Sequence, residues 1–182
     1  MFKIIKIEKK NFNFLYNEAK FFAQIVLNKK ISNLDDIFNH IINKKNSRRI
    51  LFEVLNMLPS LQRVQYDFKK YLPKGFKNKA INWTYPQIRI DGKFNNQFSA
   101  PLHKDEWILD KNKKGLVIWF PINKKGASLY FSKSKKLNKF SRHRYWGIYS
   151  KDKVKLEKIH LKFGNAIIFD ETMVHKSVEN EN

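Results

Sequence analysis

The chain has 182 residues, of which 42% are hydrophobic and 16 are Phe, so it has enough apolar material to form a folded core. It has no Cys, which excludes disulfides, thiolate metal sites and a Cys nucleophile, and we expect a cytoplasmic protein. The net charge of +21 comes from 37 basic residues, but only six of these are Arg, the residue best suited to bind phosphates and bases. The lysines are also scattered along the chain, so we do not expect nucleic acid as a partner.

The N-terminal part of the chain predicts one strand followed by helices. The first ten residues, MFKIIKIEKK, alternate apolar and basic side chains, which predicts a strand and not a signal peptide. No apolar run in the sequence reaches transmembrane length, so no membrane partner is expected. Apolar residues at three- and four-residue steps predict helices over residues 14–27, 32–45, 47–58 and 60–72. Together these segments predict a helical layer over residues 1–75.

Short strands replace helices from about residue 83 onward. The strand-like segments are QIRID, FSAPLHKDEWI, KGLVIWFPI, GASLYFS, KVKLEKIHLKF, GNAIIFD and TMVHKSV. Several of them are separated by Gly-containing turns, which is typical of a β-sandwich or barrel. The basic segment SRHRYWGIYS is predicted to be a loop. The expected fold class is therefore α+β, with a mainly β core behind an N-terminal helical layer.

Three residues on the predicted strands have the chemistry of a metal site. His103 and Asp105 are two apart, so on one strand both side chains point to the same side. His175, in FDETMVHKS, lies on a second predicted strand. Two imidazoles and one carboxylate form the facial triad that binds Fe(II) and leaves positions open for a co-substrate and oxygen. The H-x-D tripeptide alone is a weak signal, because a solvated surface His and Asp have the same spacing.

The order and spacing of several motifs over residues 83–182 resemble a known family. PQIRIDGK, LHKDEW, GLVIWFPINKKGASLYF and KFGNAIIFDETMVHKS are similar to segments of the phytanoyl-CoA dioxygenase-like branch of the Fe(II)/2-oxoglutarate-dependent oxygenases. The likeness is greatest to its small bacterial members. The resemblance implies a double-stranded β-helix, that is, a cupin-like jelly roll, over residues 83–182, within a single domain of 182 residues.

By the same resemblance, His103, Asp105 and His175 are the Fe(II) ligands, and 2-oxoglutarate and O2 occupy the remaining positions. The reaction implied is oxidation of a C–H bond of a small molecule, with decarboxylation of 2-oxoglutarate to succinate. The protein then acts by holding the target carbon and the anionic co-substrate and by excluding water.

One departure from the family concerns the Arg that usually binds the distal carboxylate of 2-oxoglutarate. The family carries it about ten or more residues after the distal histidine, whereas this sequence ends at Asn182, so we expect the C-terminal strand and its Arg to be missing. The candidates to replace that Arg are Arg89, Lys113 and Lys114, for which a structural Arg and solvated lysines are the alternatives. Gln87, two residues before Arg89, would share a face with it and is a candidate for contact with the co-substrate or the substrate.

Two further residues are candidates for contact with the substrate. Trp107, two residues after Asp105, is expected to line the mouth of the site. Arg142, in the basic segment, is expected to meet an anionic group of the substrate, with a solvated surface position as the alternative.

Three other hypotheses account for the same sequence. The first is a cupin-like metal-binding protein without oxygenase activity, and the second is a truncated or degenerate homologue that keeps the fold but not turnover. The third, from a different class, is a basic β-barrel that binds nucleic acid, a hypothesis motivated by charge alone.

Overall fold

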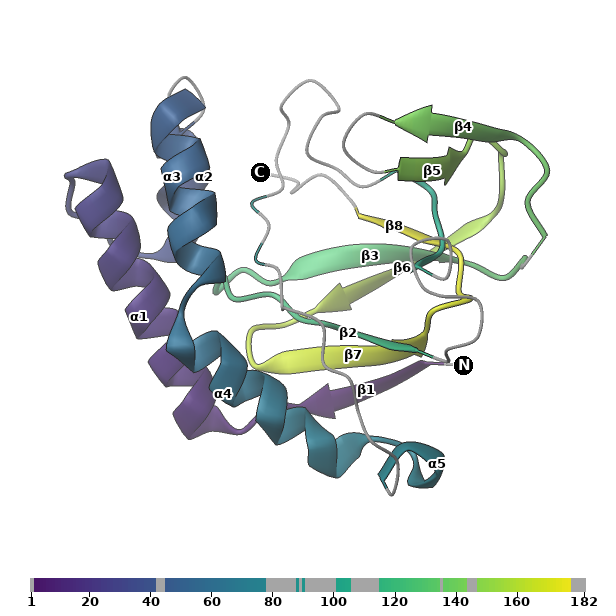
Figure 1. Ribbon diagram of the computed structural model, residues 1–182, viewed down its shortest axis with the longest axis horizontal. Helices are drawn as coiled ribbons and strands as arrows, with labels where there is room; N and C mark the ends of the chain where they lie inside the picture. The colour runs from purple at the N-terminus through teal and green to yellow at the C-terminus, as the bar shows by residue number, and fades with distance from the viewer. Residues whose placement is uncertain are drawn as a thin grey trace. The chain divides into compact units, whose positions relative to one another are not determined.

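The computed structural model describes residues 2–41, 45–77, 88, 90, 101–105, 115–134, 136–143 and 147–177 (Figure 1). It is a mixed α and β structure whose strand pairs, where a register is defined, are antiparallel. The chain divides into two compact units. The helical unit comprises Ile5–Ile90 and Ile122–Lys124, and the strand unit comprises Met1–Ile4, Asp91–Pro121 and Lys125–Asn182.

The helical unit contains helices in all four segments that the apolar periodicity predicts, and a further short helix, α5, that it does not predict. They are α1 (Lys9–Leu27), η1 (Leu34–Asp36), α2 (Ile37–Ile41), α3 (Lys45–Asn56), α4 (Pro59–Asp67), η2 (Phe68–Tyr71) and α5 (Lys74–Lys77). The first helix starts five residues earlier than predicted, because the N–H of Phe12 already donates to the carbonyl of Glu8 and the Phe12 side chain is buried. The predicted second helix begins instead as the 3₁₀ turn η1, after Asn33.

Packing within the helical unit centres on α1. This helix buries one face, formed by Phe12, Leu15, Tyr16, Ala19, Ala23 and Leu27, and it contacts both α3 and α4. Glu18 joins α1 to the start of α4, since its carboxylate accepts hydrogen bonds from the N–H and the hydroxyl of Ser60. The residue at the N-cap of α4, Leu58, makes no side-chain cap, so Glu18 takes the place of a capping residue there.

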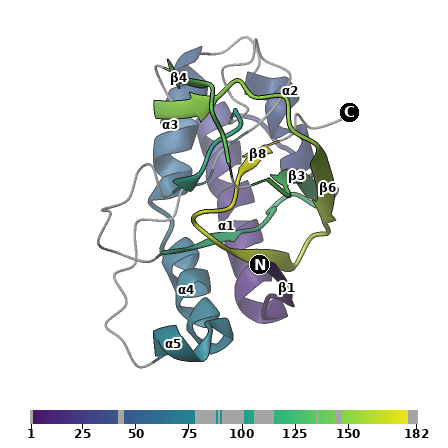
Figure 2. The same ribbon diagram turned by 90° about the vertical axis from the view of Figure 1, so that its right-hand side faces the viewer.

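The strand unit contains most of the predicted strands and, in addition, β4 and β5, which lie in a predicted loop. The strands are β1 (Phe2–Lys6), β2 (Leu116–Trp119), β3 (Ala127–Ser132), β4 (Phe140–His143), β5 (Gly147–Ser150), β6 (Leu156–Leu161), β7 (Asn165–Asp170) and β8 (His175–Ser177). They form two three-stranded sheets, ordered β1-β7-β2 and β6-β3-β8, and a β4-β5 pair. Strands β3, β6 and β8 lie side by side in both views (Figure 2).

A core of aliphatic and aromatic side chains joins the two larger sheets. Its buried members are Leu129, Phe131, Ile159 and Leu161 from the β6-β3-β8 sheet, with Ile167 and Phe169 from the β1-β7-β2 sheet. Alternation along each strand places these side chains on the inner faces, as expected for two stacked sheets. The strand unit therefore has its own hydrophobic core.

Two segments differ from the sequence-based prediction. The predicted loop 141–150 is mostly a β-hairpin, in which β4 pairs with β5 from Phe140↔Ser150 to His143↔Gly147. Asp152 closes this hairpin, because its Oδ2 accepts the N–H groups of Asn138 and Lys139 at 2.6 and 3.1 Å. Of the predicted strand 98–108, the structure describes residues 101–105. These residues form one isolated β-bridge, at His103, and not a continuous strand.

Candidate metal centre

His175 is held by the core of the strand unit. It begins β8 and pairs with Phe131 of β3, so both side chains project from the same face of the sheet. Its ring lies against two aromatic rings, with its centroid 5.9 Å from that of Phe131 and 4.8 Å from that of Phe169. Only 6% of the residue is exposed. Packing therefore restricts the imidazole to one position and excludes water from two of its sides.

His103 is brought to His175 by a backbone bridge between segments 72 positions apart in the sequence. Each histidine donates its N–H to the carbonyl of the other at 2.9 Å, which makes them a hydrogen-bonded antiparallel pair. The side chains of such a pair stand next to each other, and here the ring centroids are 4.3 Å apart. Leu102, which packs against Val174, and the N–H of Ser150, which donates to the Leu102 carbonyl, hold this segment in place.

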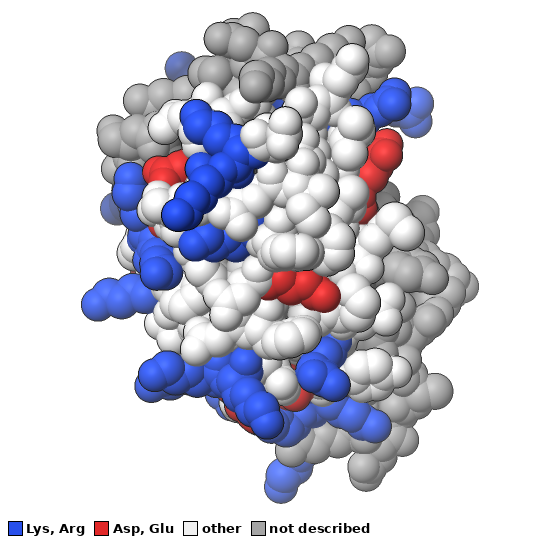
Figure 3. All heavy atoms as spheres, turned by 90° about the vertical axis from the view of Figure 1, so that its left-hand side faces the viewer, with Lys and Arg blue, Asp and Glu red and all other residues white. Residues whose placement is uncertain are grey.

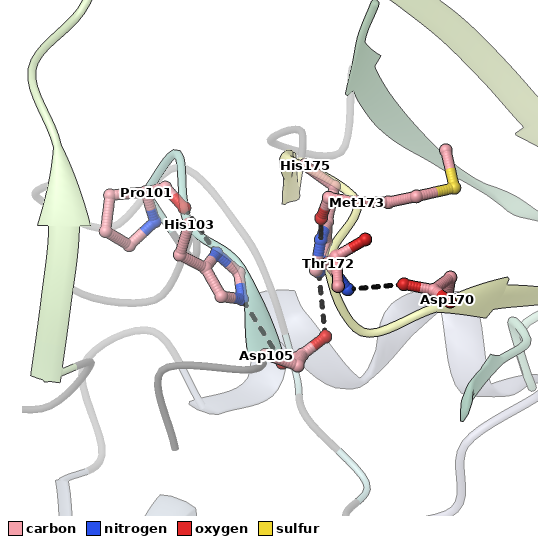
Figure 4. Close-up of polar contacts among 7 residues, drawn as sticks. All are labelled: Pro101, His103, Asp105, Asp170, Thr172, Met173 and His175. Carbon is pink, nitrogen blue, oxygen red and sulfur yellow. Dashed lines mark hydrogen bonds and ion pairs between the residues drawn. The ribbon is translucent and has the colours of Figure 1, made fainter. Parts of the chain in front are cut away.

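Asp105 faces both imidazoles (Figure 4). Its Oδ1 lies 3.7 Å from Nε2 of His103, and its Oδ2 lies 3.5 Å from Nε2 of His175. The three ligand atoms all lie within 4.8 Å of one another. The two residues of the H-x-D tripeptide thus converge as predicted, although Asp105 lies in a 3₁₀ turn and not on a strand. The convergence comes from the turn after the bridge as well as from strand alternation.

Backbone carbonyls orient both rings in the same way. Nδ1 of His103 lies 2.6 Å from the carbonyl of Pro101, and Nδ1 of His175 lies 3.0 Å from the carbonyl of Met173. A carbonyl only accepts hydrogen bonds, so each Nδ1 carries the proton and donates it. In the neutral rings this leaves a lone pair on each Nε2, the atom that faces Asp105. Both histidines therefore direct an unprotonated Nε2, the form that binds a metal, toward the same carboxylate.

A tight turn supports the carbonyl that orients His175. The N–H of Thr172 donates to Oδ1 of Asp170 at 2.9 Å, and the N–H of Met173 donates to the Asp170 carbonyl at 3.0 Å (Figure 4). These two bonds make residues 170–173 a closed turn between β7 and β8. The Met173 carbonyl is thus held at a fixed distance from the ring that it orients.

The donor set fits a first-row divalent metal ion. Two imidazole nitrogens and a carboxylate oxygen suit Fe(II), Mn(II), Co(II) and Zn(II), while the absence of Cys from the chain removes thiolate selection. Ligand atoms about 2.1 Å from a common ion lie roughly 3.0–3.5 Å apart in octahedral or tetrahedral geometry. The separations of 3.5 and 3.7 Å between Nε2 and carboxylate oxygens are close to that range. Each separation joins an imidazole to a different carboxylate oxygen, and one ligand atom from each residue lies within 4.8 Å of the others, so the three residues are near enough together to hold one ion.

An apolar pocket adjoins the triad within the strand unit. It is lined by Phe2, Phe131, Ser132, Lys133, Glu157, Met173 and Val174. Two of these residues also contact or orient His175: Phe131 packs against its ring, and Met173 accepts its Nδ1 hydrogen bond.

The other candidate site residues have different positions. Arg142 lies on β4, paired with Ile148, and is exposed to solvent. Gln87, Arg89, Trp107, Lys113 and Lys114 lie outside the described residues. Phe131, Phe169 and the carbonyls of Pro101 and Met173, which position the rings, were not predicted from the sequence. The Phe residues have the pattern of ordinary core positions, and a backbone carbonyl leaves no signal in the sequence.

Comparison with protein-family models gives no match, and comparison with curated proteins also gives no match. Among the described residues, none of the helices combines the length and the apolar character needed to cross a membrane. The geometry of the triad is therefore the main structural indication of function.

Proposed function

We propose that the protein is an Fe(II)- and 2-oxoglutarate-dependent oxygenase of the phytanoyl-CoA dioxygenase-like group, acting on a small molecule. The observation that carries the proposal is the pair of Nε2 atoms, each left with its lone pair by an Nδ1 bond to a carbonyl, facing one carboxylate. When bound, Fe(II), 2-oxoglutarate and O2 supply the oxidation of a C–H bond, coupled to loss of CO2 from 2-oxoglutarate to give succinate.

The strand connectivity supports a jelly roll around this triad. Consecutive strands change sheets from β2 to β3, from β6 to β7 and from β7 to β8. The bridge at His103 adds a further neighbour to β8, so the order on that side becomes β6, β3, β8 and then the His103 segment. Chains that cross repeatedly between two stacked antiparallel sheets are typical of jelly rolls and related Greek-key folds.

The residues of the chain have three tasks in the proposed reaction. His103, Asp105 and His175 bind the metal from one side and leave its other side open for the co-substrate. The rings of Phe131 and Phe169 hold His175 and keep water from its buried faces. The adjoining apolar pocket offers space for part of the substrate, and the exposed guanidinium of Arg142 is accessible to an anionic group.

Anaerobic addition of Fe(II) and 2-oxoglutarate to the metal-free protein tests this proposal. We expect a visible charge-transfer band that requires both components, and succinate formation when air is admitted. His103→Ala and Asp105→Ala should each abolish the band, while Arg142→Gln should keep it, since this residue is assigned only to the substrate.

Two results of this experiment would contradict the proposal. Tight Fe(II) binding without a band on addition of 2-oxoglutarate would favour a cupin-like metal-binding protein or a degenerate homologue. Unchanged Fe(II) binding in His103→Ala would remove the triad itself from the metal site.

A further inference from the structure

Helix α1 has two apolar faces, of which only one is buried. The residues Phe14, Phe21 and Ile25 are 53, 57 and 57% exposed, although all three are large and apolar. At 3.6 residues per turn they lie within about 40° of one another around the helix, roughly opposite the buried face that includes Leu15 and Ala19. They therefore form one stripe, about 16 Å long, along the solvent side of α1.

Lysines lie at both ends of this stripe. Lys10 precedes Phe14 by four residues, and Lys29 and Lys30 follow Ile25 directly after the helix ends; all three lysines are exposed. The acidic residue that borders the stripe, Glu18, directs its carboxylate to the N–H and hydroxyl of Ser60 at the start of α4. The view toward this side shows a mostly white surface that contains one acidic patch, with Lys and Arg above and below it (Figure 3).

We propose that the Phe14–Phe21–Ile25 stripe binds the surface of an anionic lipid membrane, with α1 lying parallel to it. An interfacial helix inserts bulky apolar side chains between the headgroups and acyl chains, while its lysines reach anionic headgroups. The stripe and its flanking lysines have this arrangement. The mode of binding is peripheral, so it needs no apolar run of spanning length, the feature from which the sequence predicted no membrane partner.

The charge of the chain favours a lipid surface over a second copy. Pairing two copies through the stripe would bring Lys10, Lys29 and Lys30 of both chains together, within a protein of net charge +21. An anionic bilayer neutralises the same lysines and buries the same apolar side chains. Each lysine near such a surface contributes roughly a fivefold gain in binding.

Co-sedimentation of the full chain with lipid vesicles tests this inference. We expect binding to phosphatidylcholine vesicles that contain about a third phosphatidylserine, and at least about tenfold weaker binding to pure phosphatidylcholine. The affinity of the triple variant Phe14→Ser, Phe21→Ser and Ile25→Ser for the anionic vesicles should be at least about tenfold lower than that of the wild type. Lys29→Gln should lower the affinity for the anionic vesicles about fivefold. Added salt should weaken the binding of the wild type to these vesicles.

Phe140→Ser is the matched control, because Phe140 on β4 is 54% exposed but lies outside the stripe. It should bind anionic vesicles as the wild type does. His103→Ala should also bind unchanged, so failure of the proposed oxygenase function and failure of this inference are distinguishable. Circular dichroism confirms that each variant is folded.

Three results would overturn the inference. The first is no binding to the anionic vesicles, and the second is equal loss in the triple variant and in Phe140→Ser. The third is a concentration-dependent dimer, seen by light scattering, that the triple variant abolishes, since this would identify a second copy as the occupant of the stripe.

Discussion

Substitutions at His175 separate the metal-binding contribution of its imidazole from the packing contribution. His175→Ala removes both the ligand atom and a ring that is 6% exposed between Phe131 and Phe169, and leaves a cavity. His175→Phe refills most of that space with a ring that has no ligand atom. It also leaves the Met173 carbonyl without its Nδ1–H donor.

The expected magnitudes follow from these contacts. Without metal, His175→Ala should lower the free energy of unfolding by about 2–4 kcal/mol, as for other large buried side chains cut to Ala. His175→Phe should cost less than about 2 kcal/mol, from imperfect packing and the lost hydrogen bond. A metal at 100 times its Kd adds about 2.7 kcal/mol to the wild type, which is about 5–11 °C in Tm for a chain of this size. Neither variant should gain this increment.

Thermal unfolding followed by circular dichroism, with and without Mn(II) as a metal that is not oxidised in air, measures both quantities. Arg142→Gln is the control and should show the full metal-dependent rise in Tm, because Arg142 is exposed on β4. A rise of the wild-type size in His175→Phe would refute the assignment of His175 as a ligand. A loss as large in metal-free His175→Phe as in His175→Ala would refute the packing argument.

Two further predictions concern the backbone and the response to pH. Gly126 and Gly164 both have positive φ, 77° and 84°, but only at Gly126 would an added Cβ approach the Leu161 carbonyl oxygen, to 2.2 Å. Gly126→Ala should therefore lower the free energy of unfolding in urea by more than about 2 kcal/mol, and Gly164→Ala by about 1–2. The pKa of Asp152 lies below its ordinary value of 3.8, because the N–H groups of Lys139 and Asn138 donate hydrogen bonds to its carboxylate. A depressed folded-state pKa means that Asp152 stabilises the fold above pH 3.8 and that this contribution is lost as the pH falls through the folded-state pKa.

Each of these two predictions can be contradicted by one measurement. Equal losses in the two Gly→Ala variants would show that the close approach to Leu161 is relieved by a backbone shift. For the carboxylate, urea unfolding of the wild type and Asp152→Asn should differ at neutral pH and converge in acid. A difference that stays constant from pH 6 to about 2 would contradict the stabilising role of the ionised carboxylate.

Local sequence patterns determined most of the helices and strands and the identity of the three candidate ligands. The apolar periods of α1, α3 and α4, and the short strands β3 and β7, follow from side-chain alternation that neighbouring residues set by themselves. His103, Asp105 and His175 were identifiable because few residue types bind metals and because the spacing of H-x-D is local. The jelly-roll assignment and the resemblance to an oxygenase family stay predictions.

The tertiary structure decided how these residues face one another. The bridge that pairs His103 with His175, and the Pro101 and Met173 carbonyls that fix both tautomers, depend on backbone groups that every residue carries, so no residue type marks them in the sequence. The hairpin at 140–150 likewise needed its partner strand, because a basic, polar segment has no apolar alternation to predict it. Apolar periodicity indicated a helix over residues 14–27, but which apolar face it buries depends on contacts with α3 and α4. Only those contacts left Phe14, Phe21 and Ile25 facing solvent.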